Sequence, residues 1–222
     1  MLEIKNVSKF YRVGEEKISA LDNIDFCVND GEFVAITGQS GSGKSTLMNI
    51  LGCLDKASEG QYFIDGKDTS SLNDSELSRI RGIKIGFVFQ NFSLVSTLTA
   101  YENIELPLIY KGIGKRERRK RILSALENVN MTERMHHLPS QLSGGQMQRI
   151  AVARALAGDP SVILADEPTG NLDGKNTSEV MSILKNLNKM GKTVVIVTHD
   201  SAVAQMAKRR IILNLGKIDS FS

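Results

Sequence analysis

The sequence predicts an α/β fold with a mostly parallel sheet, an antiparallel β portion near the N-terminus and an inserted helical lobe. Continuous apolar runs alternate with amphipathic helical patterns, which is typical of a parallel sheet covered on both faces. The N-terminal segment instead alternates apolar and polar residues, as half-exposed strands do. A mainly helical stretch at about 91–158 interrupts this order. We therefore expect one domain over 1–222, with a core of 1–90 and 159–222 and a helical lobe between them.

The overall composition indicates a folded domain, its net charge does not by itself argue for a nucleic-acid partner, and we expect none. Its 222 residues are 41% apolar and 24% charged, which is sufficient for a buried core. The 28 Lys and Arg only slightly outnumber the 25 Asp and Glu, too small an excess to indicate a nucleic-acid partner. No apolar run approaches the roughly 18 residues of a membrane-spanning helix. Met1–Lys5 lacks the features of a secretion signal, so we expect a cytosolic chain, or one held at a membrane by a partner.

Strands and helices can be assigned in order along the chain. Alternation predicts the first strands and continuous apolar runs predict the buried ones: 2–7, 24–28, 33–36, 162–165, 193–198 and 210–213. Periodic apolar positions and capping residues predict the helices: one starting near Lys44, one after Asn73, one after Thr99, 115–130, one after Ser143 and 177–190. Glu76 and Glu102 follow Asn73 and Thr99 by three residues, which is the spacing of a capping box.

A glycine-rich segment between a predicted strand and a predicted helix matches the phosphate-loop pattern, Gly38-x-x-x-x-Gly43-Lys44-Ser45. Glycines let the backbone fold its amide hydrogens around an anion, and the helix N-terminus adds its positive dipole end. Lys44 would neutralise the β- and γ-phosphates, Ser45 would ligate Mg²⁺, and Thr46 would reach the α-phosphate. The predicted nucleotide contacts are Gly38, Ser40, Gly41, Ser42, Gly43, Lys44, Ser45 and Thr46. The alternative is a Gly/Ser turn that merely precedes a helix.

Two carboxylates end the strand predicted at 162–165. Asp166 and Glu167 would lie at the carboxyl ends of parallel strands, where ligands bind in such sheets. Asp166 would hold Mg²⁺ through water, and Glu167 would polarise the water that attacks the γ-phosphate. An acidic turn that only closes the strand is the alternative.

The cysteines and the adjacent histidines do not have the spacing of metal ligands. Cys27 and Cys53 are expected to be buried free thiols in a reducing compartment. His136 and His137 are adjacent and cannot present both rings on one helix face. The segment 188–191 lacks the aspartate that would read guanine, which argues against a GTPase.

Further motifs resemble those of ATP-binding-cassette ATPases over nearly the whole chain. The resembling motifs, in the family order, are Tyr11, Gln90, Leu142-Ser143-Gly144-Gly145-Gln146, Asp166-Glu167, Asn171-Leu172-Asp173 and Thr198-His199-Asp200. The resemblance implies a P-loop NTPase core that hydrolyses ATP with Mg²⁺. In such a site Tyr11 stacks on adenine, Gln90 contacts the metal and couples to the lobe, and His199 contacts the γ-phosphate.

The resemblance also implies a site shared between two copies of the chain. Ser143, Gly144, Gly145 and Gln146 of one copy would close over ATP held by Lys44 of the other, and hydrolysis would release the dimer. The catalytic residues would be Lys44, Gln90, Glu167 and His199, and the metal contacts Ser45, Gln90 and Asp166. A separate membrane permease would dock near Gln90 and the lobe, placing the chain at the cytoplasmic face of a membrane.

Three longer segments are similar to one bacterial branch of the family. They are Leu51–Asp55, Leu98–Leu108 and Ala165–Asp173, and the branch includes the ATPases of lipoprotein-release, macrolide-export and antimicrobial-peptide-resistance systems. This resemblance implies an exporter or extractor. The chain departs from the branch at Gln39 and Met147 and by lacking a proline in 56–59, but none of these positions is an expected phosphate contact.

Alternatives exist for single residues and for the whole chain. Tyr11 could pack within its strand, Gln90 could be an ordinary strand-end amide, and His199 could be a satisfied core histidine. The basic run Lys115–Arg121 is expected to be a solvated helix face, with anionic lipid headgroups as its alternative partner. The alternative functions are a soluble ATPase of DNA repair, chromosome handling or translation, and a cell-division regulator that moves no cargo.

Overall fold

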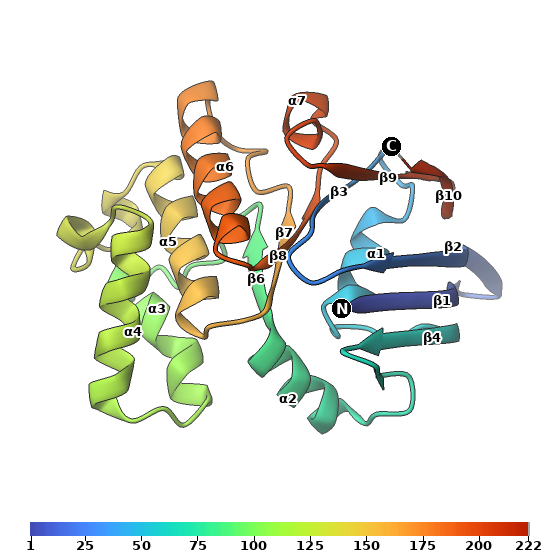
Figure 1. The fold of residues 1–222 in the computed structure, drawn as a ribbon, viewed down its shortest axis with the longest axis horizontal. Coiled ribbons are helices and arrows are strands. Elements are labelled where there is room, and N and C mark those ends of the chain that lie inside the picture. Colours follow the sequence, from blue (N-terminus) through green and yellow to red (C-terminus); the bar gives the residue numbers. More distant parts are fainter. Residues whose placement is uncertain (222) are drawn as a thin grey trace.

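Two sheets form the framework of the computed structural model, which describes residues 1–221 (Figure 1). A six-stranded sheet has the order β10-β9-β3-β8-β7-β6, and a four-stranded sheet has the order β2-β1-β4-β5. The larger sheet contains β3 (Phe33–Gly38), β6 (Ile85–Phe89), β7 (Val162–Asp166), β8 (Thr193–Val197), β9 (Arg209–Asn214) and β10 (Lys217–Phe221). The smaller sheet contains β1 (Leu2–Val13), β2 (Glu16–Val28), β4 (Glu59–Ile64) and β5 (Lys67–Asp68), and all its pairs are antiparallel. The predicted α/β class with two kinds of sheet is confirmed.

The register of the larger sheet aligns the carboxyl ends of its central strands. β9, β3, β8, β7 and β6 pair in parallel, and β10 runs antiparallel to β9. Ile36 pairs with Val197, which pairs with Asp166, so the segments that follow β3, β7 and β8 leave the sheet at one edge. These strands are continuous apolar runs because both their faces are buried. Ligands of such sheets bind at this edge.

Helices cover both faces of the larger sheet. α1 (Lys44–Leu51) lies between the two sheets, where Leu47 and Met48 share one apolar core with β3, β8 and the antiparallel strands. α6 (Gly174–Lys189) packs Val180 and Leu184 into a second core on the opposite face. These side chains are at most 2% exposed, and each such burial contributes about 1.5–3 kcal/mol. The packing therefore fixes the position of α1, which begins directly after the phosphate loop.

The inserted lobe lies beside α6 in Figure 1 and consists of three helices and two short 3-10 turns. They are α3 (Ala100–Tyr110), α4 (Lys115–Asn128), η1 (Thr132–Arg134), η2 (Pro139–Gln141) and α5 (Gly144–Ala157). The capping boxes predicted from Asn73 and Thr99 are present at α2 (Asp74–Lys84) and α3, and Ser143 caps α5 as expected. α7 (Ser201–Ala204) follows β8. The helical lobe is thus confirmed, while its residue boundaries stay a prediction.

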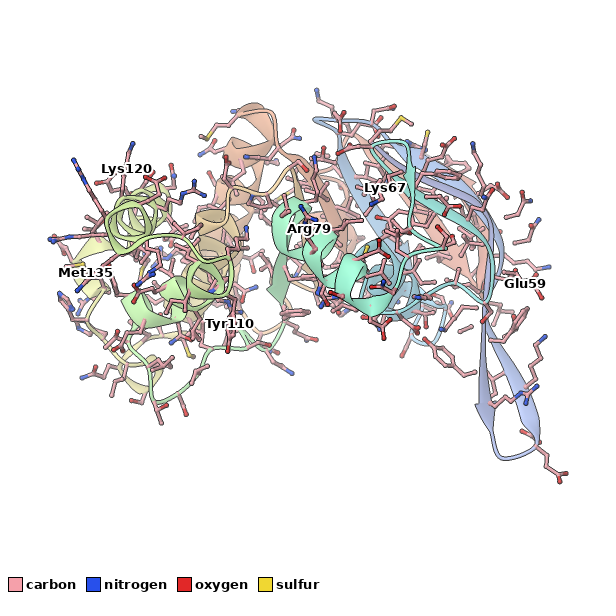
Figure 2. The ribbon with its side chains drawn as sticks, turned by 90° about the horizontal axis from the view of Figure 1, so that it is seen from below. Glu59, Lys67, Arg79, Tyr110, Lys120 and Met135 are labelled. Atoms are coloured by element: carbon pink, nitrogen blue, oxygen red, sulfur yellow. The ribbon has the colours of Figure 1, made fainter. Side chains whose placement is uncertain are left out.

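The observed strand and helix boundaries differ from the predicted ones in two situations. The exposed strands are longer or were not predicted, and one helix begins before its predicted first residue. β1 and β2 run well beyond 2–7 and 24–28, because backbone pairing holds a hairpin end that projects from the body (Figure 2). β4, β5 and β10 are additional strands, and β5 and β10 carry mostly polar side chains without an apolar pattern. α6 begins at Gly174 rather than 177, because the Asp173 side chain accepts from the Asn176 backbone N–H. No helix within residues 1–221 is long and apolar enough to cross a bilayer.

Candidate nucleotide-binding site

The loop between β3 and α1 adopts a backbone that requires glycine. Gly41 and Gly43 have φ values of 77° and 100°, in the region that side chains disfavour. A Cβ atom on Gly43 would also lie 2.5 Å from the carbonyl oxygen of Ala20. Gly43 is the N-cap of α1 and supplies no side-chain cap, so the first helical amides stay available to an anion.

This loop forms one wall of a cleft of about 410 Å³. The lining combines three strand ends and part of β2: Ser40, Gly41, Gly43, Lys44, Ser45 and Thr46 after β3, Asp166 and Glu167 at β7, His199 after β8, and Ile18, Ser19 and Ala20 on β2. The ammonium of Lys44 donates to the carbonyl oxygens of Gly38 (2.8 Å) and Gln39 (2.7 Å), which holds it against the loop. Gly38 and the buried Ser42 belong to the loop but not to the lining. The parallel register thus brings most of the predicted phosphate, metal and water-activating residues together.

Glu167 is held by hydrogen bonds from the segment that follows β8. Its Oε1 accepts from the backbone N–H of His199 at 3.0 Å and lies 2.6 Å from His199 Nδ1. Its Oε2 accepts from the Thr198 hydroxyl at 3.1 Å. The Glu167 side chain is 14% exposed, whereas that of His199 is 69% exposed. The carboxylate is therefore oriented at the cleft wall, with an accessible imidazole beside it.

Two predicted site residues, Tyr11 and Gln90, lie outside the cleft lining. Tyr11 is 38% exposed and its hydroxyl donates to Asp55 Oδ2 at 3.0 Å. Gln90 packs against the segment after β7, since a Cβ atom on Gly170 would lie 2.7 Å from Gln90 Nε2. Asn171 Nδ2 also donates to the Gln90 carbonyl oxygen at 3.2 Å. Adenine stacking by Tyr11 and metal contact by Gln90 therefore stay predictions.

The Ser143–Gln146 segment forms the N-terminal end of α5 and is also absent from the cleft lining. Ser143 Oγ accepts from the Gln146 backbone N–H at 3.3 Å, and the Gln146 side chain accepts from the Ser143 backbone N–H at 2.9 Å. Gly145 is buried, and a Cβ atom there would lie 2.0 Å from Asn176 Oδ1. Gly144 has room, with its nearest neighbours at 3.7 Å. Within one chain, this segment does not line the cleft that holds Lys44.

With this geometry established, comparison with known proteins identifies the family. The family model described as ABC transporter matches residues 21–170. The chain belongs to the ABC transporter family. It is the family's ATP-binding cassette and an ATPase, which confirms the resemblance found in the sequence.

The cassette is similar along its length to proteins named as ABC transporter or macrolide export ATP-binding proteins. It is 54% identical to the uncharacterized ABC transporter ATP-binding protein MJ0796 of Methanocaldococcus jannaschii, covering 99% of this chain and 95% of that protein. It superposes on a dimeric structure of MJ0796 with a TM-score of 0.92 and 52% identity, covering 100% of this chain and 98% of the other. A second dimeric MJ0796 structure, bound to ADP and Pi, has the same TM-score, identity and coverage. The cassette is also 47% identical to the macrolide export ATP-binding/permease protein MacB of Hyphomonas neptunium, covering 100% of this chain but 34% of MacB.

Burial and charge in the cleft act on Asp166. Burial raises the pKa of its carboxyl above the usual value, and the neighbouring Glu167 raises it further, while Lys44 opposes both effects. An ionised Asp166 therefore costs the folded state free energy. A cation bound beside it would offset this cost.

The cleft residues fit a magnesium ion held largely by phosphate. No group of three or more His, Cys, Asp or Glu side chains within residues 1–221 is arranged to hold a metal by itself. Mg²⁺ commonly takes one or two carboxylates and completes its shell with substrate phosphates and water. Asp166 and the exposed Ser45 line the same cleft as the phosphate loop, which matches that pattern.

Sequence reasoning left some contacts of the site unassigned. Thr198 is fully buried and positions Glu167, and its signal in the sequence is a hydroxyl at the end of an apolar strand. Ile18, Ser19 and Ala20 line the cleft from the β1–β2 hairpin, and nothing in their pattern indicates it. Asp55, the partner of Tyr11, is 44 residues away in sequence and could not be paired with it.

We expect Asp166→Asn to raise the melting temperature at pH 7. A carboxyl whose folded-state pKa is raised stabilises the fold below its unfolded pKa, and that stability is lost as the pH rises through the folded pKa. Thermal melts without nucleotide should therefore show a gain at pH 7 that shrinks toward pH 4.

Asp159→Asn is the control, because the pKa of Asp159 is shifted in the opposite direction. Its hydrogen bond with Lys192 lowers the Asp159 pKa, so this variant should be equally or less stable than the parent at pH 7. A lower melting temperature for Asp166→Asn at pH 7 would contradict the electrostatic assignment.

Proposed function

We propose that this ABC ATPase closes as a homodimer around ATP and powers a membrane transporter that exports or extracts its cargo. The main support for this proposal is that one chain keeps two groups of predicted site residues apart. Lys44, Glu167 and His199 line the cleft, whereas Ser143–Gln146 lies at the N-terminal end of α5 outside it. The dimeric structures of MJ0796 support closure of two copies, because they are similar over the whole chain.

In this proposal the cleft binds the phosphates and prepares the attacking water. The loop amides and the N-terminal end of α1 bind the phosphate oxygens. Lys44 exchanges its bonds to the Gly38 and Gln39 carbonyls for bonds to the β- and γ-phosphates. Glu167, oriented by Thr198 and His199, polarises the water for attack on the γ-phosphate. Because His199 Nδ1 faces Glu167, its Nε2 is left to contact the γ-phosphate.

The metal and the second copy complete the charge balance of the transferring phosphate. Ser45 and Asp166 would hold Mg²⁺, with Gln90 as a further contact, and the ion would supply neutralisation of the phosphate charge. The partner's α5 presents its N-terminal amides and Ser143 hydroxyl to the γ-phosphate, where a helix dipole favours an anion.

The membrane partner docks, in this proposal, in the groove between α2, β6 and the lobe. The groove has a volume of about 1210 Å³ and carries exposed apolar side chains. Tyr110 is 88% exposed and Ile83 is 52% exposed, and Figure 2 shows Tyr110 and Arg79 on the two flanking helices. The groove also includes Phe89, the residue before Gln90, so an occupant would adjoin the predicted coupling residue. The fused ATP-binding/permease organisation in the name of MacB supports a membrane chain as the occupant and the cytoplasmic membrane face as the location.

Replacing Tyr110 tests this surface. Tyr110→Ser should abolish co-purification with a co-expressed permease, because the largest exposed apolar contact of the groove is lost. Leu215→Ser is the matched control, since Leu215 is 83% exposed but lies in the β9–β10 turn outside the groove. Equal recovery of the permease with both variants would exclude the groove as the docking surface.

Replacing Glu167 tests the chemistry. Glu167→Gln keeps the shape but removes the carboxylate that polarises water, so ATP hydrolysis should fall by about a hundredfold or more. ATP binding should persist, and light scattering should show an ATP-dependent dimer. Glu76→Gln is the control, because glutamine also serves in the capping box of α2, so its hydrolysis should match the parent. Hydrolysis by Glu167→Gln within a few-fold of the parent would remove Glu167 from the catalytic role.

Mixing two inactive variants tests the shared site. Lys44→Ala removes the phosphate cation, and Gly144→Asp places a negative charge where the partner's γ-phosphate would bind. Gly144 suits this purpose, because a Cβ atom there would lie no closer than 3.7 Å to its neighbours and aspartate is favourable at a helix N-terminus. Gly145 does not, because any side chain would clash with Asn176 and disturb the fold itself.

The mixed sample should recover activity that neither variant has alone. A mixed dimer pairs the intact Lys44 of one chain with the intact Gly144 of the other, so one of its two sites is whole. Equal mixing yields up to roughly a quarter of parent activity if one whole site suffices. Failure to recover activity, together with a rate per chain that is independent of protein concentration, would refute the shared site.

A further inference from the structure

The Asp55 carboxylate is hydrogen-bonded to Tyr11 and to Lys9, the lysine that lies over the Tyr11 ring. Its Oδ2 accepts the Tyr11 hydroxyl at 3.0 Å, and its Oδ1 accepts from Lys9 Nζ at 2.6 Å. Lys9 Nζ also lies 5.1 Å from the centre of the Tyr11 ring and donates to the Lys56 carbonyl oxygen at 2.7 Å. The side chain of Lys9 is only 12% exposed, so its ammonium is committed to this network.

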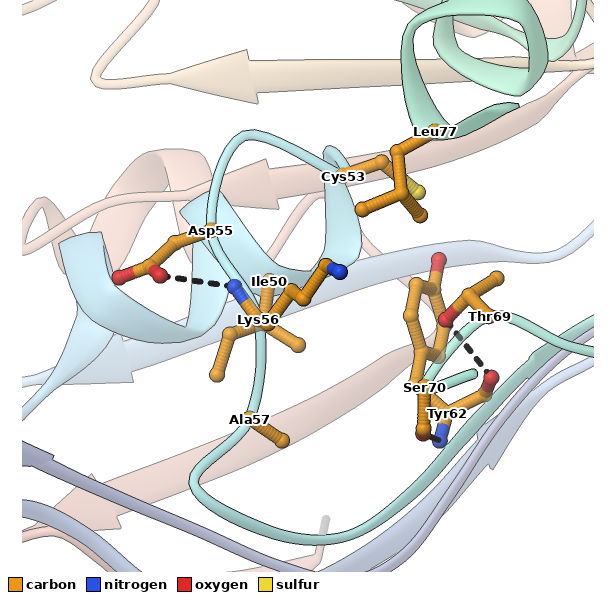
Figure 3. Close-up of a pocket in the computed structure, with 9 residues that line it drawn as sticks. All are labelled: Ile50, Cys53, Asp55, Lys56, Ala57, Tyr62, Thr69, Ser70 and Leu77. Carbon is orange, nitrogen blue, oxygen red and sulfur yellow. Dashed lines mark hydrogen bonds between the residues drawn. The ribbon is translucent and has the colours of Figure 1, made fainter. Parts of the chain in front are cut away.

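The turn that carries Asp55 is fixed to the end of α1. The backbone N–H groups of Leu54 and Asp55 both donate to the Asn49 carbonyl oxygen, at 2.8 and 3.2 Å. Arg81 donates to the Cys53 carbonyl oxygen at 2.6 Å from α2. Figure 3 shows the Asp55 carboxylate bonded to the Lys56 backbone N–H and turned away from Tyr62 and Leu77. Because α1 begins at the phosphate loop, Asp55 has a fixed position relative to that loop.

Tyr11 itself lies on a part of β1 that β4 does not pair with, next to Phe10, whose backbone N–H donates to Ser58 Oγ at 3.1 Å. β4 pairs with β1 only as far as Ser8, so beyond Ser8 the described pairing of β1 is with β2 alone. Tyr11 pairs there with Ile18, near the projecting end of the hairpin (Figure 2). Two-stranded ribbons are only marginally stable by themselves. The bond to Asp55 therefore adds to the Phe10–Ser58 bond in tying this end of β1 to the body of the cassette, and it acts on the Tyr11 side chain itself.

The arrangement also determines which face of the ring can stack. A cation over one face of an aromatic ring is attracted to its π-electrons and excludes a second ring from that face. Lys9 occupies one face of Tyr11, so a base would stack on the opposite face.

We propose that Asp55 is a positioning residue for nucleotide-base recognition, holding the Tyr11 ring at a fixed distance from the phosphate loop. The proposal rests on the proposed function, in which the loop binds ATP phosphates and Tyr11 stacks on adenine. Asp55 touches no nucleotide and acts through Tyr11. It makes the spacing between base and triphosphate a property of the folded chain rather than of a mobile hairpin.

The charge state of Asp55 agrees with this role. Burial opposes ionisation of the carboxyl, but hydrogen bonds from Lys9, Tyr11 and the Lys56 backbone outweigh it and lower the pKa. The acceptor of the Tyr11 hydroxyl is thus a carboxylate throughout the neutral pH range. Hydrogen bonds to an ionised acceptor are stronger than neutral ones.

The test compares a ligand with a base and a ligand without one. Asp55→Ala and Tyr11→Phe each remove the bond between the two side chains, and Tyr11→Phe keeps the ring. Both variants should bind ATP about threefold to tenfold more weakly, the scale of a lost aromatic stack. Binding of inorganic tripolyphosphate, measured by calorimetry, should be unchanged. The double variant should be no weaker than the weaker single one, since both remove one interaction.

Asp65→Ala is the matched control. Asp65 is also a half-exposed aspartate that accepts from a lysine, Lys84, but it has no contact with Tyr11. This variant should bind ATP and tripolyphosphate as the parent does. Should Asp55→Ala not fold, Tyr11→Phe still removes the bond, because phenylalanine has no hydroxyl to donate.

The outcomes separate the proposal from the function on which it rests. Tyr11→Ala should lower the preference for ATP over tripolyphosphate, and no change there would mean that Tyr11 does not stack on adenine. If Tyr11→Ala lowers that preference while Asp55→Ala and Tyr11→Phe leave it unchanged, positioning by Asp55 is refuted. An equal loss of ATP and tripolyphosphate binding by Asp55→Ala also refutes it, because the defect would then lie in the phosphate loop.

Discussion

The parallel register of β3, β7 and β8 is the constraint on which the site depends. It aligns Ile36, Val197 and Asp166 across the sheet, so the phosphate loop, the carboxylate pair and the His199 segment emerge side by side. Their strands are buried on both faces, so a slip of one residue would move each side chain from one packed core into the other and is disfavoured. The segments of the candidate site are thereby attached to strands that are buried on both faces.

At this edge the backbone is strained at Glu167, the carboxylate proposed to polarise the attacking water. Glu167 has a φ of 43°, which residues with side chains rarely adopt. Its backbone N–H donates to the Val197 carbonyl oxygen at 2.9 Å, and its side chain is held by Thr198 and His199. Strained conformations persist only where the surroundings fix them, as these bonds from the neighbouring strand do.

The sequence was sufficient for the parts of the site that follow from local pattern. Three features each depend on only a few neighbouring residues. They are the loop from Gly38, the carboxylates after an apolar run and the Ser143 cap. The missing parts depend on contacts between distant segments. Neither the pairing of Tyr11 with Asp55 nor the packing of Gly145 on Asn176 leaves a periodic signal. The polar edge strands β5 and β10 lack one as well, because most of their side chains face solvent.

Other contacts between distant segments connect α5 to both parts of the proposed site. α5, whose first turn is proposed to meet the partner's ATP, donates from the buried Gln148 to the Pro168 carbonyl oxygen at 2.7 Å. Pro168 directly follows Glu167, so the helix is bonded to the segment beside its own catalytic carboxylate. Further along α5, Arg154 donates to the carbonyl oxygens of Phe92 and Ser93, in the loop after Gln90. A displacement of α5 on the proposed closure would therefore be transmitted by direct hydrogen bonds to the Glu167 segment and to the Gln90 loop beside the groove.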